Sequence, residues 1–177
     1  SIAADGGLYA EMVKNRSFEF PQNLMGWRAY GKFEVRNDGP FERNPHYVRL
    51  AYSGHSDKFT GLENEGFFGI AVKKDATYRF SLWARCPEGG KSTLEVSLVD
   101  NDTMEEDQRF ARVKVDISGK DWKKYTATLK ASRTENKGAL RIFLAGDKAT
   151  TDVEHISLFP TDTWKGRENG MRKDLAQ

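Results

Sequence analysis

The feature that most constrains this chain is a two-residue alternation of apolar and polar side chains. It is clearest over residues 77–85 (TYRFSLWAR). Successive side chains of a β-strand point to opposite faces, so this pattern gives one apolar face and one mixed face. The side chains expected in a core are Tyr78, Phe80, Leu82 and Ala84. Trp83 is then expected on the opposite, outward face.

The same period recurs along the chain between turn signals. Alternating segments lie at 94–98, 113–117, 125–129 and 140–144, with weaker strand candidates at 47–52, 67–72 and 153–159. Residues 87–90 (PEGG) and 118–121 (SGKD) are typical of the turns that separate them. About eight strands with one apolar face each need two sheets packed face to face. The sequence therefore predicts an all-β fold, a jelly-roll β-sandwich of two antiparallel sheets.

Composition excludes several classes of protein. The 177 residues include 28 Lys and Arg against 26 Asp and Glu, so basic residues are not in the excess expected of a dedicated nucleic-acid binder. No apolar run approaches the roughly 20 residues needed to cross a bilayer. The single cysteine, Cys86, excludes an internal disulfide framework. Neither nucleic acid nor a membrane is therefore expected as a partner.

The two ends depart from the alternation. Over residues 7–15, Leu8 and Met12 lie on one helical stripe, which predicts a short helix or an irregular flank. Residues 167–177 are typical of the first turns of a helix, which would expose Met171 and Leu175. We therefore expect the natural chain to continue beyond this segment.

Both ends also resemble a known enzyme family. Residues 4–19 (ADGGLYAEMVKNRSFE) are similar to the N-terminal signature of family 51 α-L-arabinofuranosidases. Residues 156–176 (ISLFPTDTWKGRENGMRKDLA) resemble the segment where that family's chain re-enters its catalytic (β/α)₈ barrel. The resemblance implies a barrel-flanking segment at 1–16, an inserted sandwich at 17–160 and a linker back to the barrel at 161–177. It also implies that the catalytic glutamates lie beyond Gln177, so this chain is not expected to be an enzyme.

The middle of the chain resembles carbohydrate-binding modules of the family 4/9/22 type. The similar segments are Gly26-Trp27, residues 65–69 (EGFFG), residues 78–85 and residues 122–125 (WKKY). The resemblance implies a non-catalytic module from an enzyme that acts on arabinan or arabinoxylan, with cell-wall polysaccharide and the parent's catalytic barrel as partners. It also implies a periplasmic or secreted parent. A sandwich that only braces the barrel is the alternative, and a small independent hydrolase is the weakest hypothesis.

Sugars are bound by aromatic rings under their apolar faces and by charged or amide groups at their hydroxyl rims. Alternation places Trp83 outward, flanked by Arg79 and Arg85, and gives Glu95 and Phe143 the same outward parity. If those strands are neighbours, they form one aromatic platform. The alternative for Trp83 is packing under a loop or against the barrel.

Three further aromatic residues are candidates for binding or for packing. Trp27 and Tyr30 follow a Gly-containing turn and are candidates for a binding loop, although a core position is the alternative for Trp27. Trp122, just before the strand at 125–129, is expected in the core.

No cofactor is required by this interpretation, but modules of this type often hold a structural calcium ion bound by oxygen ligands. The resemblance implies Glu19, near the first strand, and Glu154, near the last, as its ligands. The related modules more often have an acidic pair where this chain has Glu154-His155. Solvent-exposed carboxylates without a metal are the alternative.

Overall fold

The computed structural model describes residues 10–52, 59–100, 108–145 and 149–161. These ranges contain β-strands and turns and no α-helix. The strands in chain order are β1 (Trp27–Tyr30), β2 (Lys32–Arg36), β3 (Tyr47–Ala51), β4 (Gly61–Asn64), β5 (Ile70–Val72), β6 (Thr77–Arg85), β7 (Lys91–Asp100), β8 (Arg109–Ser118), β9 (Lys123–Lys130), β10 (Glu135–Leu144) and β11 (Thr151–Pro160). No described segment forms a helix of the length and apolarity that a membrane crossing requires.

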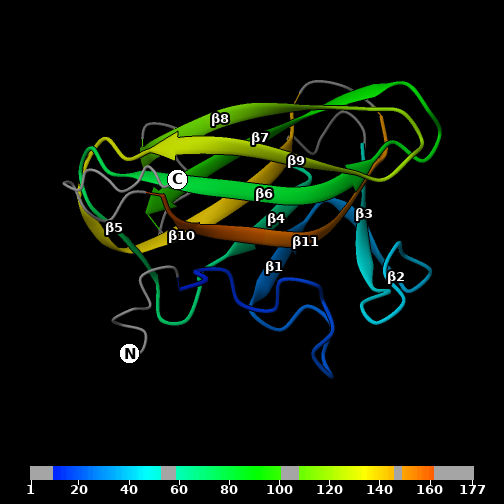
Figure 1. Cartoon of the computed structure of the whole chain (residues 1–177), viewed down its shortest axis with the longest axis horizontal. Helices are drawn as coiled ribbons and strands as arrows, with labels where there is room; N and C mark the ends of the chain where they lie inside the picture. Colours follow the sequence, from blue (N-terminus) through cyan, green and yellow to red (C-terminus); the bar gives the residue numbers. More distant parts are fainter. Residues whose placement is uncertain (1–9, 53–58, 101–107, 146–148, 162–177) are drawn as a thin grey trace.

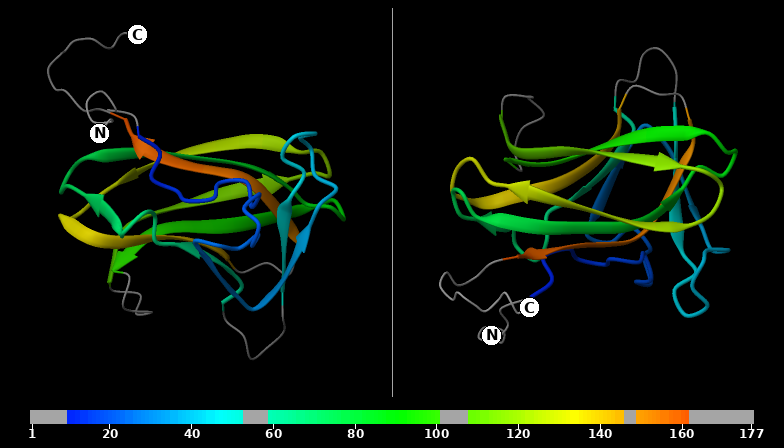
Figure 2. Two further views of the ribbon diagram at one scale, coloured as in Figure 1. Left: turned by 90° about the horizontal axis from the view of Figure 1, so that it is seen from below. Right: turned by 45° about the horizontal axis from the view of Figure 1, so that its top comes forward.

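The strands form two antiparallel sheets packed face to face, as Figures 1 and 2 show. The six-stranded sheet has the order β1-β4-β10-β7-β8, with β5 paired to β10, and the five-stranded sheet has the order β2-β3-β11-β6-β9. Strands that are neighbours in the sheets are often distant in sequence. The predicted jelly-roll sandwich is confirmed.

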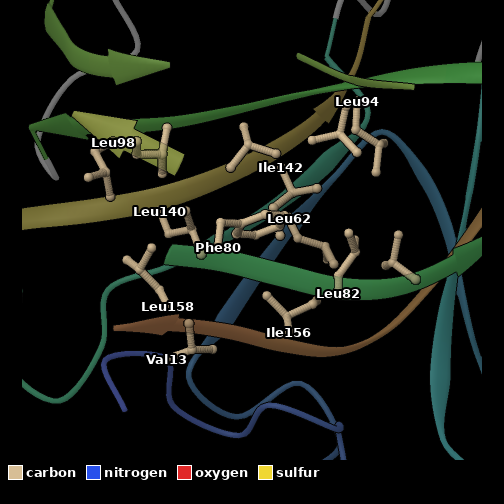
Figure 3. Close-up of a cluster of buried hydrophobic side chains, with 14 of the residues drawn as sticks. Val13, Leu62, Phe80, Leu82, Leu94, Leu98, Leu140, Ile142, Ile156 and Leu158 are labelled. Atoms are coloured by element: carbon tan, nitrogen blue, oxygen red, sulfur yellow. The ribbon is translucent and has the colours of Figure 1, made fainter. Parts of the chain in front are cut away.

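The core lies between the sheets and is built from the alternating positions. Figure 3 shows Phe80 and Leu82 of β6 facing Leu140 and Ile142 of β10 across the interior. All four side chains are completely buried. Because each fully buried aliphatic or aromatic side chain contributes roughly 1.5–3 kcal/mol, this face-to-face packing is the main stabilising term of the fold.

The N-terminal segment follows β11 instead of forming a helix. The Met12 amide donates to the Leu158 carbonyl (2.9 Å), and the Ile156 amide donates to the Arg16 carbonyl (3.0 Å). Glu11 accepts hydrogen bonds from the Ser157 hydroxyl (2.5 Å) and the Leu158 amide (2.7 Å). Of the two alternatives predicted for residues 7–15, a short helix or an irregular flank, residues 10–15 match the irregular flank. The helix predicted over 167–177 lies outside the described residues.

We call residues 10–18 the strap. It pairs with the part of β11 that β3 leaves without a neighbour. β3 pairs only with Thr151–Val153 at the start of β11, and the strap takes over beyond a bulge at residues 154–157. The strap is thus part of the sandwich surface. The predicted boundary between residues 16 and 17 stays a prediction, as do those around residue 160.

Candidate functional site

The candidate sugar-binding residues lie on two different surfaces. Arg79, Trp83 and Arg85 belong to β6, in the five-stranded sheet. Tyr30, Glu95 and Phe143 belong to β1, β7 and β10, in the six-stranded sheet. The outer faces of a two-layer sandwich point in opposite directions, so the strands do not meet the condition for a single platform. The alternation correctly predicted that these side chains face outward, but it could not predict which of the two sheets holds each strand.

Trp27 lies inside the sandwich. Only 7% of its surface is exposed, and its ring packs on Phe18 at 5.3 Å between centroids. The indole Nε1 donates to the Asn15 carbonyl at 2.8 Å. A buried tryptophan with its one donor satisfied is a core residue. The structure thus matches the core alternative for Trp27, not a binding loop.

The face of β6 that bears Trp83 is partly covered by a loop. The Phe41 ring, between β2 and β3, meets Trp83 edge to face at 5.2 Å and lies 5.8 Å from the His155 ring. Trp83 is accordingly half-buried, whereas Arg79 on the same strand is exposed. This geometry matches the alternative in which Trp83 packs under a loop, and it leaves little of the indole free to stack on a sugar.

Arg85 is anchored by an ion pair and by aromatic rings. Its Nε donates to Asp152 (2.9 Å), and its guanidinium carbon lies 4.8 Å from the centre of the Trp122 ring. Trp122 also contacts Tyr47 edge to face at 5.1 Å. The expected core position of Trp122 is therefore wrong, because this half-buried indole packs with Arg85 and Tyr47 and not between the sheets.

The outer face of the six-stranded sheet combines aromatic and charged groups in two rows. Strand register aligns Arg28, Glu63, Arg141, Ser97 and Arg112 across β1, β4, β10, β7 and β8. The adjacent row contains Tyr30, Gly61, Phe143, Glu95 and Lys114. We call the part of this surface around Tyr30, Phe59, Phe143 and Glu63 the aromatic face.

Three rings of the aromatic face contact one another. The Phe143 ring lies 5.7 Å from Tyr30 and 5.8 Å from Phe59, measured between centroids. Phe59 is 39% exposed, and the other two rings are partly exposed. Gly61 lies between them in the register, where a Cβ atom would collide with the Phe143 ring. The glycine thus allows the phenylalanine to lie over β4, beside Tyr30.

A buried carboxylate organises the charges beside these rings. Glu63 is 2% exposed and accepts from the Arg141 Nε (2.7 Å) and from the Arg28 Nη1 (3.0 Å). Farther along the sheet, Glu95 accepts from the Arg109 Nη1 at 2.7 Å. Charge-assisted bonds of this kind hold long side chains in one geometry. The face therefore presents apolar rings next to fixed polar groups.

Glu63, Arg28 and Phe59 were not among the residues selected from the sequence. Residues 61–64 (GLEN) show no clear alternation over so short a strand, and Phe59 lies before that strand. Their role depends on β4 pairing with both β1 and β10, strands that are remote in sequence. No local signal identifies that pairing.

The candidate calcium ligands lie close enough to interact. Glu154 is fully buried, its Oε1 accepts from the His155 amide (2.7 Å), and its Oε2 has no hydrogen-bond partner. Burial, with a smaller contribution from the negative charge of Glu19, raises the pKa of Glu154 to about 9. Glu19 is bonded to the amide and ring Nδ1 of His46 (2.8 and 2.7 Å).

An orphaned buried carboxylate oxygen beside a second carboxylate fits a hard cation with oxygen ligands. Within the described ranges, no three His, Cys, Asp or Glu side chains are grouped to hold a metal ion. Glu19 and Glu154 would thus supply two ligands, and the rest would have to be carbonyl oxygens or water. Calcium binding stays a prediction.

A β-sandwich with rings and ion-paired groups on one outer sheet face is the architecture of carbohydrate-binding modules. Residues 10–151 match the family model described as "Carbohydrate binding domain". The chain therefore belongs to this family, and the match identifies it as a carbohydrate-binding domain, not a catalytic one.

The relatives of known name are α-L-arabinofuranosidases. An extracellular exo-α-L-arabinofuranosidase of Streptomyces chartreusis is 42% identical over 99% of this chain and 20% of its own length. Alpha-L-arabinofuranosidase 1 of Arabidopsis thaliana is 30% identical over 99% of this chain and 27% of its own. The chain thus spans only a fifth to about a quarter of these relatives.

Solved structures agree with this assignment. An arabinose-bound GH51 α-L-arabinofuranosidase matches with a TM-score of 0.76 and 27% identity, covering 98% of this chain and 30% of that one. A Clostridium thermocellum xylanase with a CBM22 module, complexed with xylohexaose, matches with a TM-score of 0.60 and 19% identity over 86% of this chain and 29% of that one. The second likeness concerns the fold alone. The resemblance to sandwich modules of family 51 enzymes is confirmed.

Proposed function

We propose that this chain binds arabinose-containing cell-wall polysaccharide, arabinan or arabinoxylan, through the aromatic face. The observation that supports this most is the cluster of Tyr30, Phe59 and Phe143 directly beside the Glu63–Arg141 ion pair. The rings offer apolar surface to the faces of pentose rings. The Arg28 side chain, 55% exposed and held by Glu63, offers donors to the hydroxyl rim. Because the relatives are named α-L-arabinofuranosidases, we propose arabinose-containing chains as the ligand.

The module would act for a catalytic domain elsewhere in the same protein. We propose that the parent is a secreted α-L-arabinofuranosidase, since the Streptomyces relative is described as extracellular. Holding the polymer near the active site raises the local substrate concentration without any new catalytic contact. Arg79, Trp83 and Arg85, on the opposite face, are not needed for this binding.

Isothermal titration with arabinan, arabinoxylan and unsubstituted xylan tests the proposal. Each productive ring contact contributes about 1 kcal/mol beyond area burial, so we expect Tyr30→Ala to weaken binding roughly 5- to 10-fold. Phe68→Ala is the matched control, because Phe68 is 99% exposed in the turn before β5 and belongs to neither the aromatic face nor the opposite sheet. No binding to any of the three polymers, or an equal loss in both variants, would contradict the proposal.

Bracing of the catalytic domain is the second candidate function, and two exposed rings favour it. Phe67 is 52% and Phe68 is 99% exposed, in the turn before β5. That turn contacts the strap, because a Cβ on Gly66 would lie 2.9 Å from the Met12 carbonyl oxygen. Exposed aromatic pairs often mark interaction surfaces.

Phe68→Ser in the full-length enzyme tests the brace. It should lower the thermal midpoint of the full-length protein by a few degrees and leave that of the isolated 177-residue chain unchanged. Equal midpoints for the wild-type and variant full-length proteins would eliminate bracing through this turn.

We also propose that Glu19 and Glu154 take part in a structural calcium site. The unpartnered Oε2 of Glu154 supports this, because a buried anion without a partner is costly and a bound cation would neutralise it. Millimolar CaCl₂ should raise the thermal midpoint of the wild-type chain and have no effect on Glu154→Gln. MgCl₂ at the same concentration is the control. An unchanged wild-type midpoint in CaCl₂ would refute calcium binding.

A further inference from the structure

A pocket of about 860 Å³ lies on the other sheet, away from the aromatic face. Its lining comes from β2, β3 and the end of β6, with Lys120 from the β8–β9 turn and Thr150 just before β11. Its volume is within the range of small-molecule binding sites. None of the residues proposed for glycan binding at the aromatic face lines this pocket.

Two arginines form a fixed base for the pocket. Arg49 donates to both carboxylate oxygens of Asp152 (2.8 and 3.1 Å), and Arg85 donates to one of them (2.9 Å). Asp152 is completely buried, whereas both arginine side chains are about a quarter exposed, at 25% and 23%. Stacking on Trp122 further fixes the Arg85 guanidinium. Both arginines line the pocket with their geometry set in advance.

Each guanidinium has donor capacity left over. The hydrogen bonds of Arg49 use Nε and Nη2, and those of Arg85 use Nε and Nη2, the latter to the Tyr47 hydroxyl at 3.4 Å. The Nη1 group of each has no hydrogen-bond partner in the part of the chain that is described. A planar guanidinium with free N–H groups matches the oxygens of a carboxylate.

The remaining lining adds positive charge and an apolar wall. Lys32 and Lys120 are also in the lining, so it contains four cationic side chains against the two carboxylates Glu34 and Glu88. Glu34 forms an ion pair with Arg36 at 3.0 Å, which reduces the negative potential that Glu34 adds to the pocket. Ala51 and Pro87 supply the apolar part of the lining.

From this geometry we propose that the pocket is a second glycan site, selective for a sugar that bears a carboxylate, such as a uronic acid residue. The carboxylate binds to the free donors of Arg49 and Arg85, Lys32 and Lys120 surround it, and the sugar ring lies against the apolar lining at Ala51 and Pro87. This site does not depend on the aromatic face.

Titration of the ¹⁵N-labelled 177-residue chain with D-galacturonate, followed by amide chemical shifts, tests this proposal. D-Galactose is the matched neutral sugar, and acetate is the carboxylate without a ring. We expect D-galacturonate to bind at least about 10-fold more tightly than either, with shifts at Phe33 and Lys120. Because the attraction is electrostatic, binding should weaken several-fold between about 50 mM and about 500 mM NaCl.

Variants separate this site from the aromatic face without disturbing the Asp152 ion pairs. The double variant Lys32→Ala/Lys120→Ala should weaken D-galacturonate binding by about 5- to 10-fold, while Tyr30→Ala should leave it unchanged. Equal affinity for D-galactose, equal affinity for acetate, no shifts up to about 50 mM D-galacturonate, or an unaffected lysine variant would each overturn the proposal. Loss of arabinan binding in Tyr30→Ala alone bears only on the aromatic face.

Discussion

At the scale of single residues, Asp152 and Glu154 are two buried carboxylates whose hydrogen-bond and ion-pair partners differ sharply. They lie two positions apart on β11, both are fully buried, and both belong to the five-stranded sheet. Asp152 accepts from two arginines, whereas one oxygen of Glu154 accepts from no group among the residues that the structure describes. Desolvation costs a buried charge several kcal/mol unless it is paired. The first carboxylate is therefore held by two ion pairs, and the second holds a proton or needs a cation.

Removing the Asp152 charge should be costly. Asp152→Asn leaves Arg49 and Arg85 facing each other without an anion, and we expect the free energy of unfolding to fall by roughly 2–4 kcal/mol. Urea denaturation measures this. Glu34→Gln is the control, because its ion pair with Arg36 joins side chains that are 58% and 32% exposed and should contribute under about 1 kcal/mol. Similar losses of unfolding free energy in the two variants would show that the ion pairs of Asp152 do not stabilise the fold.

Glu154 should make stability depend on pH. Its pKa is raised from the usual 4.5 to about 9 in the folded chain, so the folded state retains a proton that the unfolded state releases. The free energy of unfolding should therefore fall as pH rises from about 5 to about 8 without added cation, and Glu154→Gln should lack this fall.

The difference between wild type and Glu154→Gln at the two pH values isolates this effect. His155, whose pKa is lowered chiefly by burial, is present in both proteins and largely cancels. A wild-type minus variant difference that is the same at pH 5 and pH 8 would contradict the burial of an unpaired Glu154 carboxyl.

At the scale of elements, alternation located the strands β6 to β10, gave weaker candidates for β3, β5 and β11, and missed β1, β2 and β4. Strands β6 to β10 have eight to ten residues, over which period two is clear, whereas the period of β11 is interrupted by a bulge at residues 154–157. β1, β2 and β4 have only four or five residues, too few for the period to appear. Phe67 and Phe68, within the expected strand at 67–72, instead form an exposed turn before β5.

The sequence left a helix and an irregular flank open for the N-terminal strap, because its pattern is ambiguous over so few residues. Leu8 and Met12 have helical spacing, but the open edge of β11 beyond its bulge offers hydrogen bonds that the strap satisfies. Tertiary pairing thus outweighed local helical propensity. The same limit applies to the site: which sheet holds each strand depends on non-local pairing.

Glu11 should be a principal attachment of the strap. Glu11→Ala removes acceptors from the Ser157 hydroxyl and the Leu158 amide, so unfolding should become easier by about 1–2 kcal/mol. The Leu158 amide should also exchange with solvent about 10-fold faster, measured by hydrogen exchange. Glu42→Ala, at an exposed loop position, is the control. An unchanged Leu158 exchange rate would mean that the strap is held by other contacts.

At the scale of the whole molecule, the sandwich presents two outer faces with different chemistry. One combines Tyr30, Phe59 and Phe143 with the Glu63 ion pairs, and the other contains the Arg49–Asp152–Arg85 group and its pocket. A two-layer fold allows this separation because the side chains that form the core alternate with those that face outward. The first face contains the proposed arabinan or arabinoxylan site, and the second contains the proposed site for a carboxylate-bearing sugar.

Glycan binding at the aromatic face is tested most directly by mapping where an arabino-oligosaccharide contacts the chain. Amide chemical shifts of the ¹⁵N-labelled chain, followed during titration, report this in one measurement. If the aromatic face binds the glycan, the shifts concentrate at Tyr30, Gly61 and Phe143, on adjacent strands of the six-stranded sheet. Saturating shifts centred instead on Arg79 and Trp83 of β6, or no shifts at all, would contradict binding at this face.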